Sequence, residues 1–252
     1  MCLVFVLAPL VLAAAACGSG GGDPVASAAA ATAHRNTEHV EFRGTTVQNG
    51  ATLVVDGSGD FQTSPQRGTV LFSFRSPQSA GSLHEVLDGW TVYMTSDLFR
   101  GRLPAGKAWV SVDLQKAGRA AGIDFSSFSA ATPAQSLTQL RSTGKVTRIG
   151  TEKIGGVSTT HYRATIDPNK TAAGRRFEQR TRAAYAPIDV WVGGGLVRRL
   201  RIGYSAAKLG TTQMTMDFSK FGEPVSITVP PKSVTYDATK AAAAALGSGA
   251  TP

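Results

Sequence analysis

Residues 146–167 read VTRIGTEKIGGVSTTHYRATID, and residues 187–204 read PIDVWVGGGLVRRLRIGY. In each stretch, consecutive glycines separate two runs in which apolar and polar residues alternate. Alternation with a period of two is typical of half-buried β-strands, and glycine adopts the positive φ angles that tight turns require. Each stretch therefore predicts an antiparallel hairpin, and together they indicate a sheet built by a meandering chain.

The same pattern extends toward the N-terminus. The runs VEFRGTTVQ (40–48) and ATLVVDG (51–57) flank Asn49-Gly50, the dipeptide preferred in type I′ hairpin turns. Gly57-Ser58-Gly59 interrupts the second run, which predicts a bulge or a sharp bend there.

The remaining segments complete a predicted set of nine or ten antiparallel strands and two or three helices. Further strands are predicted at 67–74, at 82–96 with a turn at Asp88-Gly89, at 107–114 and at 211–219. Helices are predicted after Asp23-Pro24, at 115–122 and at 132–144, with a basic helix or crossover at 167–183. No repeat or linker divides the chain, so we expect one α+β domain with a curved sheet.

Several strands place large apolar side chains on one face. The candidate wall residues are Phe72, Phe74, Trp90, Val92, Met94, Met214, Met216 and Phe218. The apolar face of a single sheet must be covered, and only a few short helices are predicted to do so. Either an apolar cavity remains for a ligand, or helices and loops fill the space as ordinary core, and both readings stay open at this stage.

The two opening stretches resemble actinobacterial lipoproteins of the LppX/LprG type (LppX_LprAFG), which are related in shape to the LolA/LolB carriers. The segments FRGTT (42–46), GSGDF (57–61), WVSVDL (109–114) and MDFSKFGEPVSITVPP (216–231) are similar as well. The resemblance covers residues 24–237. The turn before GLVRRL is acidic in that family and is glycine here.

The resemblance implies a LolA-like half-barrel, that is, a single curved antiparallel sheet partly closed by short helices around an apolar cavity for acyl chains. It implies a protein that binds, or binds and transfers, acylated lipids or lipoglycans in the cell envelope. We expect a monomer. Members of unknown role also occur in the family, so the alternative is an envelope interaction or sensory module that contacts a partner protein.

The N-terminus predicts a membrane anchor. Residues 1–16 are uncharged and apolar, too short to span a bilayer but typical of a signal peptide. Ala14-Ala15-Ala16-Cys17 resembles a lipobox, in which the cysteine receives the lipid, and residues 17–23 form a glycine-rich tether. An ordinary signal peptide with a chance cysteine is the alternative. We expect a lipid-anchored protein on the extracytoplasmic face of the membrane, with a disordered tail at 238–252.

The charge is unevenly distributed. The chain carries a net charge of +9, and residues 163–208 hold ten Lys or Arg against three acids. For an exported protein, anionic headgroups or cell-wall polymers are better partners than nucleic acid, although a generally basic proteome explains the charge equally well. Arg198, Arg199 and Arg201 are candidates for headgroup or membrane contact, with Arg199 and Arg201 on the face opposite Arg198.

No motif indicates an enzyme, and we predict neither a cofactor nor a metal. The two cysteines both lie in the leader region and the four histidines are scattered, which argues against a Cys/His zinc site. Ser205-Ala206-Ala207-Lys208 matches S-x-x-K but has neither of its partner motifs. His34, His39, His84 and His161 have no designated nucleophile, and Glu85 and Asp88 beside His84 form at most a fragment of a triad.

Overall fold

The computed structural model describes residues 23–99, 101–122, 133, 145–165, 184–185, 187–206 and 210–247. The predicted signal peptide and Cys17 lie outside these residues, and so do almost all of the helix predicted at 132–144 and the helix or crossover predicted at 167–183. The predictions for those segments therefore remain predictions.

Thirteen strands form one sheet. They are β1 (Thr37–Gln48), β2 (Ala51–Gln62), β3 (Arg67–Arg75), β4 (Ala80–Asp88), β5 (Thr91–Thr95), β6 (Trp109–Asp113), β7 (Val146–Ile154), β8 (Val157–Ala164), β9 (Ala184–Tyr185), β10 (Ile188–Gly193), β11 (Leu196–Ala206), β12 (Gly210–Ser219) and β13 (Thr235–Asp237). The predicted number of nine or ten strands is too low. The predicted segments do not include β9 and β13, because strands of two or three residues carry too little alternation to be recognised.

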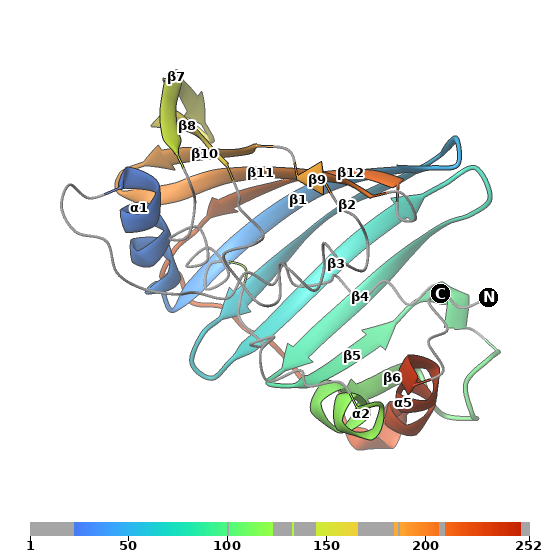
Figure 1. The fold of residues 1–252 in the computed structure, drawn as a ribbon. Helices are drawn as coiled ribbons and strands as arrows, with labels where there is room; N and C mark the ends of the chain where they lie inside the picture. The colour runs from blue at the N-terminus through green and yellow to red at the C-terminus, as the bar shows by residue number, and fades with distance from the viewer. Residues whose placement is uncertain are drawn as a thin grey trace.

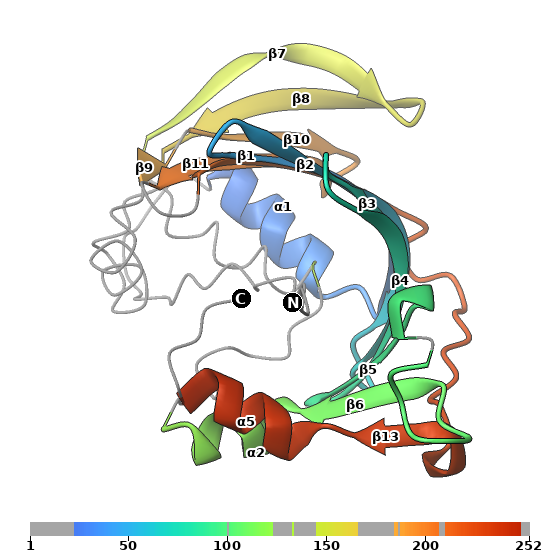
Figure 2. The same cartoon turned by 90° about the vertical axis from the view of Figure 1, so that its right-hand side faces the viewer.

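The strand order is β13-β6-β5-β4-β3-β2-β1-β12-β11-β10-β8-β7, with β9 paired to β11. Every pairing is antiparallel except that between β13 and β6. The sheet curves strongly and does not close (Figures 1 and 2). We call its inner side the concave face and its outer side the convex face. The predicted α+β class and curved single sheet are confirmed.

The hairpin turns are where the sequence predicts them. Asn49 and Gly50 have φ angles of 50° and 77° and join β1 to β2, and Gly155 and Gly156 have φ angles of 55° and 80° and join β7 to β8. Of the bulge or sharp bend predicted at 57–59, the bulge is wrong, since β2 keeps continuous register with both β1 and β3 through these residues. The two glycines serve close packing instead, as described below.

Helix α1 (Pro24–Ala33) covers one end of the concave face. The predicted cap is present, because the side chain of Asp23 accepts a hydrogen bond of 2.9 Å from the backbone of Val25. The helix packs against β10 and β11, and its buried Thr32 accepts a hydrogen bond of 2.9 Å from the Val197 backbone through its hydroxyl oxygen. This fixes α1 beneath the strands that carry the opening motif.

Helices α2 (Leu114–Ala120) and α5 (Thr239–Gly247) cover the other end, against β6 (Figure 2). The disordered tail predicted from residue 238 is therefore wrong as far as residue 247. Alanine has the highest helix propensity, and Ala242 and Ala243 of α5 pack against the core, so a sequence poor in large side chains still folds onto α2. The short 3-10 turns η1 (Asp97–Phe99) and η4 (Lys232–Val234) complete the described elements.

Between β12 and β13 the chain runs along the convex side (Figure 2). Val86, on that side of β4, is 2% exposed. At Glu85 and Val86, β4 is therefore buried on both faces.

Candidate functional site

The concave face presents rows of apolar side chains that cross the strands. Met216, Phe42, Gly57, Phe72 and Leu83 lie opposite one another on β12, β1, β2, β3 and β4. Since alternate residues of a strand share a face, the neighbouring rows lie two residues away along each strand. Together with residues of α1, these rows form one core cluster.

All seven predicted wall residues that lie in strands are on this face. Phe72, Phe74, Met94 and Phe218 are buried, and Val92, Met214 and Met216 are half-buried. Trp90 lies instead in the turn between β4 and β5, where it is half-buried. Alternation in the sequence therefore predicted correctly the face of each strand on which these side chains lie.

Sequence reasoning missed other members of this face. They are Phe42, Phe61, Leu83, Val190 and Leu200, each at most 8% exposed. The alternation of apolar and polar residues in β1, β4 and β11 is the signal that could have identified Phe42, Leu83 and Leu200.

Glycines lie beneath the aromatic rings of the concave face. A Cβ atom on Gly57 would be 2.6 Å from the Cβ of Phe72 and 2.8 Å from Cζ of Phe42, and one on Gly68 would be 2.7 Å from Cδ1 of Phe61. The rings therefore rest against the backbone where a side chain would otherwise stand, an arrangement that also shields the glycine from water. Phe42 and Phe72 meet edge to face, with ring centroids 6.3 Å apart.

Two carboxyl groups lie on this apolar face. Glu85 is 6% exposed and lies opposite Val70 on β3 and Met94 on β5. Glu38, 1% exposed, lies opposite Phe61 on β2. Burial raises the pKa of Glu85 from 4.5 to about 7. Two buried acids thus lie among the apolar rows of the concave face.

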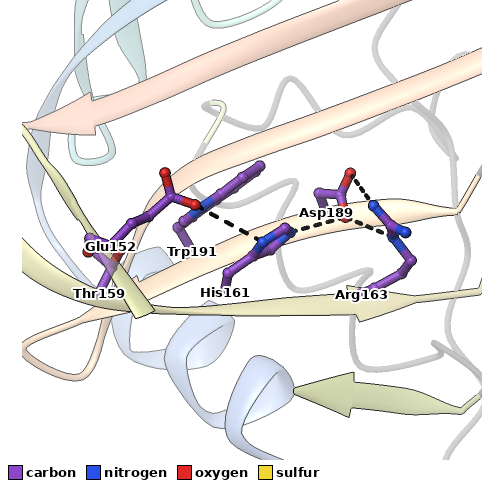
Figure 3. A network of polar contacts seen from close by, with 6 residues as sticks. All are labelled: Glu152, Thr159, His161, Arg163, Asp189 and Trp191. Carbon is purple, nitrogen blue, oxygen red and sulfur yellow. Dashed lines mark hydrogen bonds and ion pairs between the residues drawn. The ribbon is translucent and has the colours of Figure 1, made fainter. Parts of the chain in front are cut away.

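The convex face carries a network of polar contacts across β7, β8 and β10 (Figure 3). The Trp191 indole donates a hydrogen bond of 2.6 Å to Oε1 of Glu152, and the ring stacks on His161 with centroids 4.2 Å apart. Nε2 of His161 and Nε of Arg163 each lie 2.9 Å from Oδ1 of Asp189. Burial alone would raise the pKa of Asp189, but the hydrogen bonds from Arg163 and His161 lower it.

The three candidate headgroup arginines do not form one cluster. On the convex side, Arg199 pairs with Asp217 at 2.5 Å, and both Arg199 and Arg201 lie over the Trp191 ring. Arg198 donates instead to the backbone oxygen of Gly193 at 3.1 Å and lies over the Phe221 ring. Strand alternation separates them as predicted, and their contact with a membrane stays a prediction.

The histidines show no catalytic arrangement in the described part of the chain. Nε2 of His84 is 2.9 Å from the Thr69 hydroxyl on the convex face, whereas Glu85 is on the other face, so the imagined triad fragment is not assembled. His39 pairs with Asp60 at 2.7 Å. Within these residues no group of His, Cys, Asp and Glu could hold a metal ion. No helix among them is long and apolar enough to cross a bilayer.

No protein-family model matches the chain. An uncharacterised 31.2 kDa protein from the rplA–rplJ intergenic region of Streptomyces griseus is 29% identical over 150 residues, which are 52% of this chain. The aligned part is 48% of that relative, so the chain spans about half the length of the curated relative that it matches.

Two solved structures share the curved sheet. The lipoprotein LppX of Mycobacterium tuberculosis aligns over 82% of this chain and 100% of its own, with a TM-score of 0.51 and 17% identity. LprF from Mycobacterium bovis aligns over 82% and 95%, with a TM-score of 0.52 and 16% identity. The chain has the LppX/LprF fold. The resemblance carried by residues 146–204 is thus confirmed at the level of the fold.

The concave face is the candidate functional site, because its apolar rows lie between helices that pack at its two ends. The described helices pack there on β10 and β11 and on β6. The chemistry of this surface is apolar contact, supplemented by the two acids.

Proposed function

We propose that this protein binds acylated lipids on the concave face of its sheet and acts without catalysis. The observation that supports this most is the continuous set of apolar rows from β12 to β6, with aromatic rings resting on glycines. Burial of each methylene group contributes about 0.8 kcal/mol, so a long acyl chain would bind tightly without specific polar contacts. The fold shared with lipoprotein LppX supports the same proposal.

The second part of the proposal is anchoring through Cys17. It rests on the lipobox-like sequence ahead of the tether and places the domain at the extracytoplasmic face of the membrane. Cys17→Ala should release a folded protein into the soluble fraction, as measured by fractionation of cells. Retention of this variant in the membrane at the level of the wild type would contradict the anchor.

A fluorescent fatty acid such as cis-parinaric acid tests the lipid-binding part. Phe72→Asp on the concave face should abolish binding, whereas Leu71→Asp on the convex face, at a side chain 60% exposed, should leave it unchanged. Because a buried aspartate could unfold the protein, Met214→Gln provides a milder change at a half-buried position, and we expect it to weaken binding several-fold.

Equal binding by Met214→Gln, Leu71→Asp and the wild type would refute the concave face as the site. A folded wild type that binds no fatty acid at all would favour the alternative, an interaction module that contacts a partner protein.

A further inference from the structure

Glu85 is a polar group on a surface that is otherwise built for apolar contact. It lies in a row with Phe218, Val40, Val70 and Met94, and its neighbours on the same face of β4 are Leu83 and Leu87. Strand alternation, continuous register and 6% exposure together fix the carboxyl against the apolar concave side.

No hydrogen bond or ion pair within the described part of the chain reaches this carboxyl. His84 is on the convex face and bonds Thr69, and Asp88 pairs with Arg67. The concave positions of β3, β5 and β6 opposite and beside Glu85 are held by apolar residues or glycine. The remaining charged residues on elements packed against β4 are Arg75, at a convex position at the end of β3, and Asp97 of η1. Burial without a partner accounts for the pKa of about 7.

A carboxyl that is almost fully buried loses most of its hydrogen bonds to water, and the described part of the chain offers Glu85 none in exchange, which costs free energy. A leucine would complete the apolar row. Glu85 therefore adds no stability to the described part of the sheet. A bound ligand is a candidate partner for its carboxyl group.

We propose that Glu85 binds a hydroxyl group of the lipid on the concave face, and that the ligand is an acyl lipid with a polyol rather than a phosphate next to its chain. A hydroxyl both donates and accepts, so it satisfies the carboxyl in its protonated and its ionised form. A fully ionised phosphate only accepts hydrogen bonds, so it cannot donate to an ionised carboxyl and is repelled by it. This inference rests on the proposed lipid binding.

The position of Glu85 also orients the ligand. One end of the concave face carries Glu38 in the row beyond Glu85, while the rows on the other side carry Phe72, Phe74 and Met214. The next row in that direction contains Thr46 and Thr212, whose hydroxyls form a hydrogen bond of 3.1 Å with each other. The acyl chain therefore extends from Glu85 along β3 toward Phe74.

The test compares two uncharged probes of equal chain length, monopalmitoylglycerol and methyl palmitate, with palmitoyl lysophosphatidate as a third. Each displaces the apolar fluorophore N-phenyl-1-naphthylamine from the delipidated full chain. The wild type should bind monopalmitoylglycerol about ten-fold more tightly than methyl palmitate, the value of one good hydrogen bond to a buried group. Lysophosphatidate should bind more weakly at pH 8 than at pH 6.

Substitutions at Glu85 separate recognition from folding. Glu85→Leu should bind both uncharged probes equally, with methyl palmitate unchanged, and Glu85→Gln should retain most of the preference because its amide also donates and accepts. Glu41→Leu, the same exchange as the first at an exposed convex position, should behave as the wild type.

Equal affinity of the wild type for both uncharged probes, or an unchanged preference in Glu85→Leu, would overturn the role of Glu85 while leaving lipid binding intact. Failure of methyl palmitate and of the fluorophore to bind would overturn the proposed function, and this inference with it.

Discussion

Glu85 on the concave face and Asp189 on the convex face are each 6% exposed, yet their surroundings shift their pKa values in opposite directions. Asp189 receives hydrogen bonds from Arg163 and His161, which lower its pKa despite burial. Among the described residues none donates a hydrogen bond to Glu85, and burial raises its pKa to about 7. Two carboxyl groups of equal exposure can therefore differ in pKa, because their hydrogen-bond donors act on the pKa together with burial.

The difference holds for the two faces as a whole. On the convex face, polar pairs such as Arg199–Asp217 join neighbouring strands. On the concave face, aromatic rings lie against glycines, as Phe42 does against Gly57. One face uses its side chains to hold the sheet together, and the other provides an apolar surface, so substitutions at adjacent residues should have very different consequences.

The largest difference is expected between Phe72 and Leu71. Phe72→Ala removes a ring that is 2% exposed and should lower the free energy of unfolding by about 4 kcal/mol. Leu71→Ala, at a side chain 60% exposed, should change it by less than about 0.5 kcal/mol. Urea denaturation measures both, and similar losses at the two positions would erase the distinction between the faces.

The second largest effect is expected in the pH dependence of stability, between the wild type and Glu85→Gln. Because the pKa of Glu85 is raised in the folded state, its contribution is most favourable below pH 4.5 and is lost as the pH rises to about 7. The loss amounts to about 3 kcal/mol relative to Glu85→Gln, which lacks the titration. Denaturation of both proteins from pH 4.5 to pH 8 measures it, and a constant difference between them would show that Glu85 does not titrate as a buried group.

Gly57 offers a third test. Gly57→Ala places a methyl group 2.5 Å from the Leu71 backbone oxygen and 2.6 Å from the Phe72 Cβ, and should cost about 2 kcal/mol. Ser58→Ala, one residue along on the convex face, should cost less than about 0.5 kcal/mol. If Gly57→Ala has the stability of the wild type, the rings do not rest on the backbone as described.

The smallest effect is expected in the convex network. Asp189→Asn keeps a hydrogen-bond acceptor but loses the charge that pairs with Arg163, and should cost about 1.5 kcal/mol at pH 7. Since the pKa of Asp189 is lowered, this contribution is present above pH 3.8 and fades as the pH falls below it, opposite in sign to that of Glu85. Asp60→Asn, at a side chain 44% exposed, serves as the control, and equal losses for the two would argue against a special role for the network.

Alternation and turn chemistry were sufficient to predict the sheet, its hairpins and the face on which Phe72, Met94 and Met216 lie. They were insufficient for Glu85, because β4 is buried on both faces at residues 85 and 86, and the apolar pair Val86-Leu87 hides the period of two. The bulge predicted at Gly57 failed for a different reason. A glycine that makes room for a ring on a neighbouring strand has the same local sequence as one that bends its own strand.

Long-range packing explains the other differences. The tail from residue 239 forms a helix because α2 and β6 provide a surface for its alanines and because Asp237 accepts a hydrogen bond of 2.9 Å from the backbone of Thr239. The network around Trp191 depends on the pairing of β10 with β8, which brings His161 opposite Trp191. No local pattern in either strand specifies that contact.

Native mass spectrometry of the full chain purified from its own membranes tests the central claim most directly. Lipid binding on the concave face predicts a near-stoichiometric adduct of one acylated lipid that dissociates on collisional activation, separate from any covalent modification of Cys17. A folded protein recovered entirely free of non-covalent lipid would contradict the account.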